Sequence, residues 1–495
     1  MANIKSKRVA VIGGGLGGLS TAIHLSLRGF KVTLFESNEK VGGRANQIKS
    51  DGFTFDTGPT LLNYPWVFDE LFNTAGCRLE DFVDLIPVDP SILFLWPSGN
   101  NIQLTSNFTS LVKEFERVDK GSCPGLFAFL ADAAEKYNIS FDKLVCRNID
   151  NPVRWLGSLK LLEMIRIGIW RSMDRELARF FKNRFIREAL GSYGMYLGGS
   201  PQHLPGIFSI LPYGEIAMGL WLPRGGIYTL VQAMDALASK SGVDILTEQY
   251  VKQIRIRDGR VTGLSLRNAK VVECPIVVSN VDVPTTQYRL LSENGYRPSR
   301  TLKMTPSVMT FYWGINKMIE GASHHTIFMP GNTSRAYNEL IKQLRIPDEM
   351  PFYMSVASKT DPSLAPPGCS TVFVLVPLPQ SVKTNSKNGS LSTEQIKSRI
   401  MERLNLHGIR ISDSDIVNEK VLIPSDWGKR FGLFQDSAFG AAHTLFQMGS
   451  FRYPNKDRNL SGLYYTGAST TPGTGMPMVV LSGKMTAKRI CDDVC

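Results

Sequence analysis

The sequence predicts an α/β fold, with a parallel-sheet unit at its start and a mixed α+β region after it. Residues 8–15 form an apolar strand that runs into three glycines, residues 16–29 an amphipathic helix closed by a glycine, and residues 31–36 a second strand. This order is typical of a right-handed βαβ unit. A mostly helical stretch over 65–220 and β-rich segments between 300 and 450 predict the second region.

The composition is that of a globular protein, with 43% hydrophobic and 20% charged residues in 495. No stretch approaches the roughly 18 consecutive apolar residues of a membrane-spanning helix. Lys and Arg outnumber Asp and Glu by 56 to 44, a net charge of +12. Because the basic residues are scattered and no nucleic-acid module is recognisable, we expect no nucleic-acid partner.

Cysteine and histidine usage indicates the compartment and argues against a metal centre. The seven cysteines include no C-x-x-C pair, which is typical of a reducing cytoplasm. The six histidines show no metal-ligand spacing, and the adjacent pair His324 and His325 is typical of an ordinary loop or strand. We therefore expect a cytoplasmic protein without a metal site.

One segment, residues 155–173, places Lys160, Arg166 and Arg171 among Leu, Ile, Met and Trp. A basic amphipathic helix of this kind suits a membrane surface. A helix that packs on the core and exposes its polar face would have the same pattern, so both interpretations remain open.

The first strand is followed by a glycine fingerprint. Gly13, Gly15 and Gly18 match G-x-G-x-x-G, with Gly17 inside it, and the motif opens a helix whose free N–H groups favour phosphate. Glu36 follows 18 residues after Gly18, at the end of the second strand, where a carboxylate can accept hydrogen bonds from ribose hydroxyls. The alternative is a glycine-rich turn without a ligand. The context predicts a dinucleotide site.

A second glycine turn, VGGRA, decides between dinucleotides. Gly43 and its neighbour Gly42 would let a cofactor pass close to the backbone a second time. Arg44 supplies a positive charge near pyrophosphate or flavin. The extended FAD molecule requires such a second approach, whereas NAD does not. The alternative is a turn with an exposed arginine. The pattern favours FAD.

The end of the chain carries a third glycine turn, with Gly467 and Gly475 before a helix that begins near Met476. Pro477 suits a first helical turn. The N-terminus of this helix would stabilise the negative charge that a reduced flavin accumulates. The alternative is a loop that only caps the helix.

Segments throughout the chain carry a family resemblance. They are VIGGGLGGLSTAIHLSLRGFKVTLFESNEKVGGRANQIKSDGFTFDTGPT (11–60), LWLPRGGIYTLVQAM (220–234), SHHTIFM (323–329), DPSLAPPG (361–368) and LYYTGASTTPGTGMPMVVLSGK (463–484). Together they resemble the bacterial and fungal carotenoid desaturases of the phytoene desaturase type, whose relatives include dehydrosqualene desaturases and carotenoid terminal oxidases. The resemblance spans nearly the whole chain.

The resemblance implies an FAD-containing, peripherally membrane-associated protein with an amine-oxidase/GDI-like flavoprotein fold: a Rossmann-type FAD-binding domain and a mixed α+β substrate domain. It implies further cofactor contacts at Gly58 and Val251. Its reaction would introduce double bonds into a linear carotenoid precursor, phytoene or a C30 analogue such as dehydrosqualene, with oxygen or a quinone as electron acceptor.

The expected domain organisation is discontinuous. Residues 1–98, 223–295 and 455–495 form the FAD-binding domain, residues 99–222 a helical region for substrate and membrane contact, and residues 296–454 a β-rich substrate domain.

The chemistry needs a hydride acceptor and a proton acceptor. Flavin N5 can take the hydride. Glu215 is the catalytic residue that we predict for the proton, with Asp426 and Asp436 as further candidates in apolar surroundings.

Alternatives remain at the level of activity. Desaturases of this family often carry His-Pro-Gly where this chain has Thr471–Pro472–Gly473, and the segment GMPMVVLSG (475–483) resembles the oxidase-like relatives. Glu215, by contrast, resembles the desaturases. Oxidation of carotenoid end groups is therefore the second hypothesis, a non-enzymatic lipid-binding or prenyl-binding GDI-like protein a third, and an amine oxidase a fourth.

Overall fold

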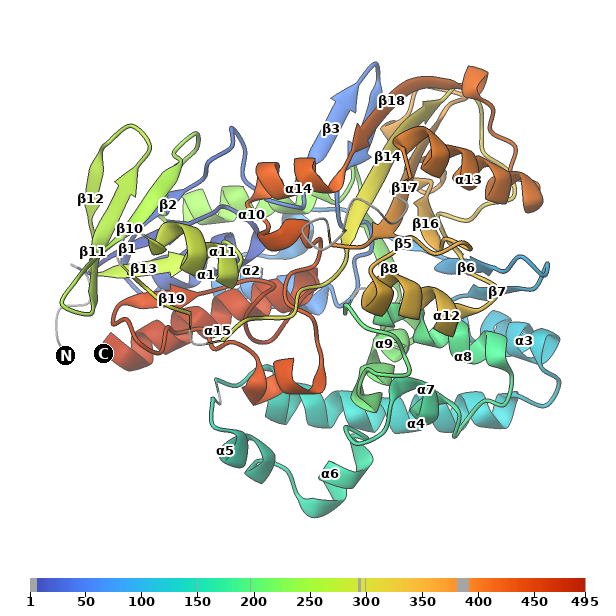
Figure 1. Ribbon diagram of the computed structural model, residues 1–495, viewed down its shortest axis with the longest axis horizontal. Helices are drawn as coiled ribbons and strands as arrows, with labels where there is room; N and C mark the ends of the chain where they lie inside the picture. Colours follow the sequence, from blue (N-terminus) through green and yellow to red (C-terminus); the bar gives the residue numbers. More distant parts are fainter. Residues whose placement is uncertain are drawn as a thin grey trace.

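Two β-sheets organise the molecule, and most helices pack around them (Figure 1). The computed structural model describes residues 7–494 except 149, 196, 293–294, 299 and 381–390. Both termini of the described chain lie at the same end, beside the smaller of the two sheets (Figure 1).

The smaller sheet has five parallel strands in the order β19-β13-β1-β2-β9. Their bounds are β1 (Arg8–Ile12), β2 (Lys31–Phe35), β9 (Asp244–Leu246), β13 (Ile276–Ser279) and β19 (Leu463–Tyr465). The central strand β1 is buried after its first residue, as a strand flanked on both faces must be. The βαβ unit predicted from the sequence is therefore confirmed, with helix α1 (Leu16–Ser26) as its crossover.

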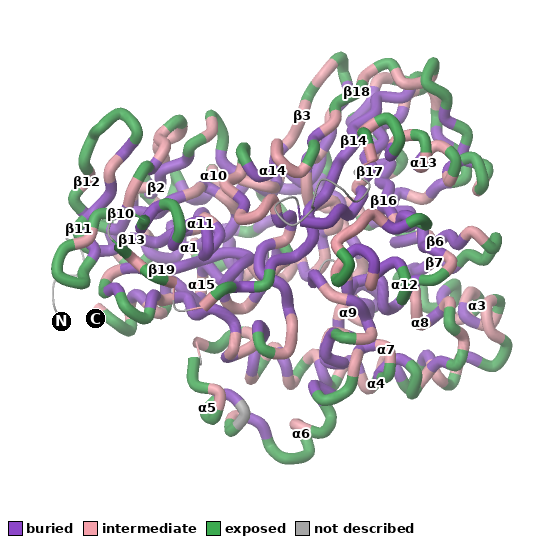
Figure 2. The backbone as a smooth tube through the Cα atoms, in the orientation of Figure 1, coloured by how far each residue is buried: buried purple, intermediate pink, exposed green. Residues whose placement is uncertain are grey.

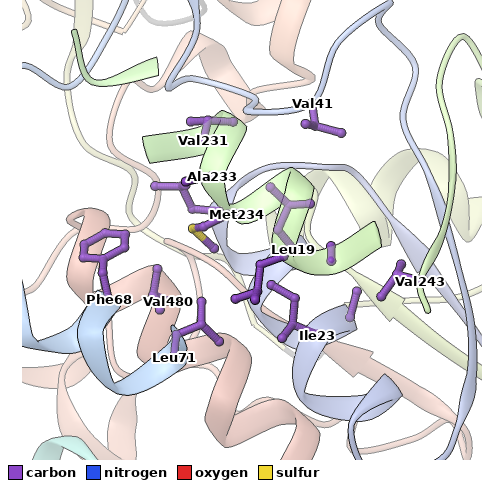
Figure 3. Close-up of a cluster of buried hydrophobic side chains, with 14 of the residues drawn as sticks. Leu19, Ile23, Val41, Phe68, Leu71, Val231, Ala233, Met234, Val243 and Val480 are labelled. Atoms are coloured by element: carbon purple, nitrogen blue, oxygen red, sulfur yellow. The ribbon is translucent and has the colours of Figure 1, made fainter. Parts of the chain in front are cut away.

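Helices from four separate parts of the chain cover one face of this sheet. They are α1, α2 (Trp66–Thr74), α10 (Tyr228–Lys240) and α15 (Met476–Val494). Figure 3 shows their shared core, in which Leu19 and Ile23 of α1 face Met234 of α10 and Val480 of α15. This packing brings the end of the chain against its beginning.

A three-stranded antiparallel sheet extends this half, with β10 (Val251–Arg257), β11 (Arg260–Leu266) and β12 (Val271–Glu273). Asp258 and Gly259 join the first two strands, and both have positive φ angles, 51° and 71°. These angles are the ones that a tight hairpin turn requires.

The larger sheet has seven strands in the order β18-β14-β17-β16-β15-β6-β7. Their bounds are β6 (Ile92–Leu95), β7 (Asn101–Leu104), β14 (Ser307–Ile315), β15 (His325–Phe328), β16 (Phe352–Ser355), β17 (Ser370–Leu378) and β18 (Ile416–Leu422). Apolar residues of α13 (Thr393–Leu406) cover one face, and the other face turns toward the rest of the molecule. The predicted domain boundary at residue 98 lies in the hairpin between β6 and β7. Both strands belong to the larger sheet, since β6 pairs with β15 and with β7.

The stretch 65–220 is less helical than its sequence predicts, because it contributes β5 (Leu85–Val88), β6 and β7 as well as helices. Besides α2, its α-helices are α3 (Phe108–Val118), α4 (Cys123–Ser140), α5 (Pro152–Gly157), α6 (Leu161–Arg166), α7 (Met173–Leu177), α8 (Arg184–Gly191) and α9 (Ile210–Met218). The remaining elements are β3 (Gln47–Ser50), β4 (Phe53–Asp56), β8 (Leu220–Pro223), α11 (Val283–Thr285), α12 (Thr333–Asn338) and α14 (Pro424–Phe431).

The single amphipathic helix expected over 155–173 is wrong. The segment is divided among α5, α6 and the turn before α7, and Gly168 adopts φ 67°, which interrupts any continuous helix. Helices α5 and α6 lie at the edge of the molecule and are mostly exposed (Figure 2). Within the described residues, no helix is both long enough and apolar enough to cross a membrane.

Candidate functional site

A cavity of about 860 Å³ collects the residues singled out from the sequence. Its wall combines the glycine turn after β1, the end of β2, the loop before α15, helix α9 and one face of the larger sheet. Every predicted cofactor residue except Gly18 lines it: Gly13, Gly15, Gly17, Glu36, Gly43, Arg44, Gly58, Val251, Gly467, Gly475 and Met476. Residues more than 400 positions apart in sequence therefore share one cavity.

The glycine turn fits tightly because side chains are absent. A Cβ atom at Gly18 would lie 2.1 Å from the carbonyl oxygen of Gly13, so this glycine lets α1 pack on β1 and lies behind the cavity wall. Helix α1 begins at Leu16, and Gly15 offers no side chain to cap it. The first N–H groups of α1 thus lack side-chain acceptors at the cavity edge, which is the arrangement that binds phosphate.

Glu36 is anchored where β2 ends. One carboxylate oxygen accepts a hydrogen bond from the Gly14 N–H at 2.7 Å, and the other accepts one from the Asn38 N–H at 2.9 Å. The side chain is buried and lines the cavity. Its position beside the phosphate-binding turn suits the ribose of a dinucleotide.

The second glycine turn lies directly against the first. Gly42 donates its N–H to the Gly14 carbonyl oxygen at 2.8 Å, and its φ of 121° is one that few other residues adopt. Arg44 reaches across the cavity edge and donates to the Ala438 carbonyl oxygen at 2.7 Å. Its guanidinium thereby links the N-terminal turn to a loop near the end of the chain.

The third glycine turn meets the first one. A Cβ atom at Gly17 would be 3.2 Å from the Gly467 backbone, so the two turns are in close contact. Gly475 has φ 106° and precedes α15, whose first residue Met476 is buried at the cavity. Behind this turn the buried Arg452 donates to the carbonyl oxygens of Thr470, at 2.7 Å, and of neighbouring loop residues, which fixes the loop.

Glu215 of α9 lines the same cavity and is 1% exposed. Ser91 donates a hydrogen bond to one carboxylate oxygen at 2.6 Å, and the Tyr193 hydroxyl donates to the other. Burial raises the pKa of Glu215 from 4.5 to about 7, and the two hydrogen bonds oppose that rise. The side chain can therefore gain or lose a proton near neutral pH.

The two other carboxylates proposed from the sequence have different surroundings. Asp426 accepts the Ile423 N–H at 3.1 Å and so caps α14, and it does not line the cavity. Asp436 does line the cavity, and its backbone has a positive φ of 54°. The geometry therefore favours Glu215 over Asp426.

Two residues of the cavity wall were missed by sequence reasoning. Asn280 follows the buried strand β13, and its amide lies 2.8 Å from where a Cβ atom at Gly15 or Gly17 would be. A polar residue directly after a buried parallel strand was the available signal. His443 lies in an irregular loop, where its ring Nε2 accepts the Thr474 N–H at 3.4 Å, and no local pattern marks it.

The residues present fit FAD. The uncapped start of α1 suits pyrophosphate, Glu36 suits ribose, and the N-terminus of α15 lines the part of the cavity that the third glycine turn shapes. Any Cβ atom at Gly18, Gly42 or Gly58 would lie within 2.4 Å of a backbone oxygen. These three glycines therefore let the first two turns pack closely against neighbouring backbone, which a larger residue at any of them would disturb.

Comparison with known proteins agrees with this geometry. Residues 16–491 match the family described as flavin containing amine oxidoreductase. A zeta-carotene-forming phytoene desaturase from Myxococcus xanthus is 33% identical over 99% of this chain and 95% of its own length, and a 4,4'-diapolycopene oxygenase from Methylomonas sp is 31% identical over 99% of both.

Among solved structures, an oxidoreductase from Methanosarcina mazei has the same fold, with a TM-score of 0.62, 18% identity and coverage of 97% of this chain and 100% of that one. This likeness agrees with the amine-oxidase/GDI-like fold expected from the sequence. The chain belongs to the flavin-containing amine oxidoreductase family, and it is an FAD-dependent oxidoreductase of the phytoene desaturase type.

Proposed function

We propose that the protein desaturates a linear carotenoid precursor, phytoene or a C30 analogue such as dehydrosqualene, in carotenoid biosynthesis. The observation that carries the proposal is the continuity of the cavity, which joins the three glycine turns to an apolar wall containing Glu215. That wall includes Leu211, Val308 and Phe373. It suits a hydrocarbon better than a charged amine.

The reaction removes two hydrogens from adjacent carbons. FAD, when bound, supplies the acceptor for one of them as a hydride. The other leaves as a proton, the C–H electron pair becomes the new double bond, and Glu215 is the group that we assign to take this proton. Ser91 and Tyr193 hold the carboxylate in place through their hydrogen bonds. Oxygen or a quinone is the proposed final electron acceptor.

Product analysis in a host that accumulates phytoene tests the proposal. We expect expression of the chain to yield products with additional conjugated double bonds, and the Glu215→Gln variant to yield far less. If the host instead made only oxygenated products from lycopene-like substrates, end-group oxidation would replace desaturation. Purified protein that binds no FAD would exclude both.

Peripheral contact with a membrane is part of the proposal, because the substrate dissolves in the bilayer. Around α5 and α6, large apolar side chains are exposed to 58–79%. They are Val153, Leu161, Leu162, Ile165 and Trp170. Exposed Lys160 and Arg171 lie among them, a combination that suits anionic lipid headgroups.

Flotation with anionic liposomes tests this surface. We expect the double change Leu161→Ser with Leu162→Ser to reduce liposome binding while FAD content stays the same, since both side chains are exposed. The matched control is Val271→Ser, an exposed apolar residue on β12 in the other half of the molecule. Equal binding by all three proteins would remove α5 and α6 from the proposal.

A further inference from the structure

Arg452, in the loop before β19, is a cation buried behind the third glycine turn. Its side chain is 2% exposed. Within the described part of the chain, every hydrogen bond of its guanidinium goes to a backbone carbonyl oxygen, and no carboxylate lies within ion-pair distance. The acceptors are Thr470 at 2.7 Å from Nε, Gln447 at 3.0 Å and Ala442 at 3.4 Å from Nη1, and Ala441 at 3.0 Å and Ala468 from Nη2.

This arrangement leaves the charge of Arg452 without a compensating anion. Carbonyl groups are dipoles without net charge, so they solvate the guanidinium but do not neutralise it. Burial, aided by the nearby charge of Arg300, lowers the pKa of Arg452 to about 9, so the guanidinium still carries its charge at neutral pH. A buried charge without a partner is costly, and a neutral donor would hold a loop at smaller cost. The charge therefore indicates a role beyond packing.

The charge of Arg452 lies directly behind the wall of the large cavity. Its Nη2 donates to the carbonyl oxygen of Ala468, which lines the cavity. Its Nη1 donates to Ala442, the neighbour of His443, which also lines the cavity. One layer of backbone thus separates the guanidinium from the bound molecule, and the protein interior screens a charge only weakly across such a distance.

Two acids on the same wall are near but do not pair with Arg452. The charge of Asp282 acts on Arg452 through space and favours its protonated form. The Asp282 carboxylate itself accepts hydrogen bonds from the Ser469 hydroxyl at 2.8 Å and from the Phe434 N–H at 3.4 Å. Asp436 lines the cavity beside this loop. These carboxylates offset part of the positive charge without an ion pair.

Further positive groups reinforce Arg452. The Arg300 guanidinium repels it, and Arg44 donates to the Ala438 carbonyl oxygen at 2.7 Å on the same wall. Helix α15 begins at the third glycine turn and directs the positive end of its dipole there. Burial lowers the pKa of His443 well below its usual value, so its ring adds no charge. The wall at this turn therefore favours a negative ligand.

FAD supplies such a charge only when it is reduced, beyond that of its pyrophosphate. The ribose, pyrophosphate and flavin follow one another in FAD, so with Glu36 at the ribose and the start of α1 at the pyrophosphate, the flavin comes next. The wall next to the first glycine turn is the third one, because Gly17 and Gly467 are in contact. Negative charge accumulates on the flavin when it takes up a hydride.

We propose that Arg452 stabilises the negative charge of reduced FAD from behind the third glycine turn and thereby raises the reduction potential of the bound cofactor. A hydrocarbon has no heteroatom whose electron pair could help to expel a hydride, so its oxidation needs a strong acceptor. The inference goes beyond the proposed function and concerns the cofactor alone. It can fail while desaturation stands, and it can hold for any hydride donor.

The reduction potential of FAD in the purified protein tests the inference without substrate. The Arg452→Met variant removes the charge and keeps much of the side-chain length. We expect its ratio of reduced to oxidised FAD, in equilibrium with a redox dye, to fall at least tenfold, a decrease in potential of about 30 mV or more. Arg452→Lys keeps the charge, and we expect a change of no more than roughly threefold, about 15 mV.

Arg403→Met is the matched control for the loss of a buried guanidinium. Arg403 lies on α13, donates to the Met329 carbonyl oxygen at 2.7 Å and does not line the cavity. We expect its potential to equal that of the unmodified protein. An Arg452→Met variant that binds FAD with an unchanged potential overturns the inference. Equal weakening of oxidised and reduced FAD also overturns it, because the charge would then act on the pyrophosphate or only hold the loop.

Two measurements decide the inference if Arg452→Met does not fold. In the unmodified protein at mildly acidic pH, where free reduced FAD takes up a second proton, we expect the potential to fall by about 30 mV per pH unit, the value for one proton with two electrons. A slope of about 60 mV, the value for two protons, overturns the inference. Arg300→Met removes the half-buried cation next to Arg452, and we expect the ratio of reduced to oxidised FAD to fall about threefold. An unchanged ratio counts against a field of buried cations at this turn and overturns the inference as well.

Discussion

The two ends of the large cavity are built by different means. At the end formed by the glycine turns, the backbone makes the site: Cβ atoms at Gly18, Gly42 and Gly58 would lie 2.1, 2.3 and 2.4 Å from backbone oxygens. At the other end, side chains make the site, because Glu215 depends on hydroxyl groups from Ser91 and Tyr193. The first end has no freedom to accept larger residues, whereas the second can exchange one side chain for another of similar shape.

This difference predicts how substitutions act. Changes at the glycine end should abolish cofactor binding together with stability, because a backbone clash disturbs the whole turn. Changes at the Glu215 end should alter rate and pH dependence while FAD remains bound.

The largest effect is expected for Gly18→Ala. The added methyl group would collide with the Gly13 carbonyl oxygen, which cannot move without separating α1 from β1. We expect the free energy of unfolding to fall by roughly 3 kcal/mol or more and FAD to be lost. The ratio of flavin to protein absorbance and thermal unfolding measure this.

Gly157→Ala is the matched control for Gly18→Ala. Gly157 also lies in a helix, and nothing lies within 4 Å of an added Cβ atom there. We expect a change in stability of less than about 1 kcal/mol and full FAD content. Full FAD content in Gly18→Ala would show that the backbone at this end is more adaptable than its geometry indicates.

Glu215→Gln should impair the reaction at the side-chain end of the cavity without disturbing the glycine end. The amide has nearly the same shape but cannot take a proton, so we expect the rate to fall by roughly 100-fold or more with FAD still bound. In the unmodified protein the rate should rise with pH through about 7, where Glu215 loses its proton. Steady-state rates across pH measure both. A variant that keeps the rate and the pH profile would remove Glu215 from the reaction.

The same substitution should change how stability depends on pH. The folded pKa of Glu215 is about 7 and its ordinary value is 4.5, so the folded protein binds more protons than the unfolded chain between these values. The contribution of this carboxyl group to the free energy of unfolding therefore falls as pH rises through that window. We expect Glu215→Gln to gain stability relative to the unmodified protein between about pH 5 and pH 8, as measured by urea unfolding. If the two proteins differed in free energy of unfolding by the same amount at every pH, Glu215 would not be the group that titrates in this window.

The smallest effect is expected for Ser91→Ala. The Ser91 hydroxyl stabilises the charged carboxylate, so its removal should raise the pKa of Glu215 further. The midpoint of the pH–rate profile should move upward by about one pH unit or less, with FAD content unchanged. A downward shift of this midpoint would show that the Ser91 hydrogen bond does not lower the pKa of Glu215.

The glycine end was accessible from the sequence because its determinants are local. Gly13, Gly15, Gly18 and Glu36 lie within one βαβ unit, where spacing along the chain fixes spacing in three dimensions. Glycine is also required there by the backbone itself, so the residue type alone carries the information.

The side-chain end was accessible only in part. Glu215 was proposed from its neighbours in sequence, but its partners Ser91 and Tyr193 lie 124 and 22 positions away. His443 reaches the cavity through the tertiary packing of an irregular loop, and Asn280 through the pairing of β13 with β1. The helix expected over 155–173 was wrong because apolar and basic spacing continued across Gly168, whose positive φ ends any helix.

The most direct test of the account mixes FAD-loaded protein with phytoene in liposomes in the absence of oxygen and follows the visible absorption of bound FAD. If one cavity joins the cofactor to a hydrocarbon wall, phytoene should bleach the flavin, with one new double bond formed for each flavin reduced, and the amine putrescine should not. Bleaching by putrescine, with none by phytoene or dehydrosqualene, would contradict the central claim.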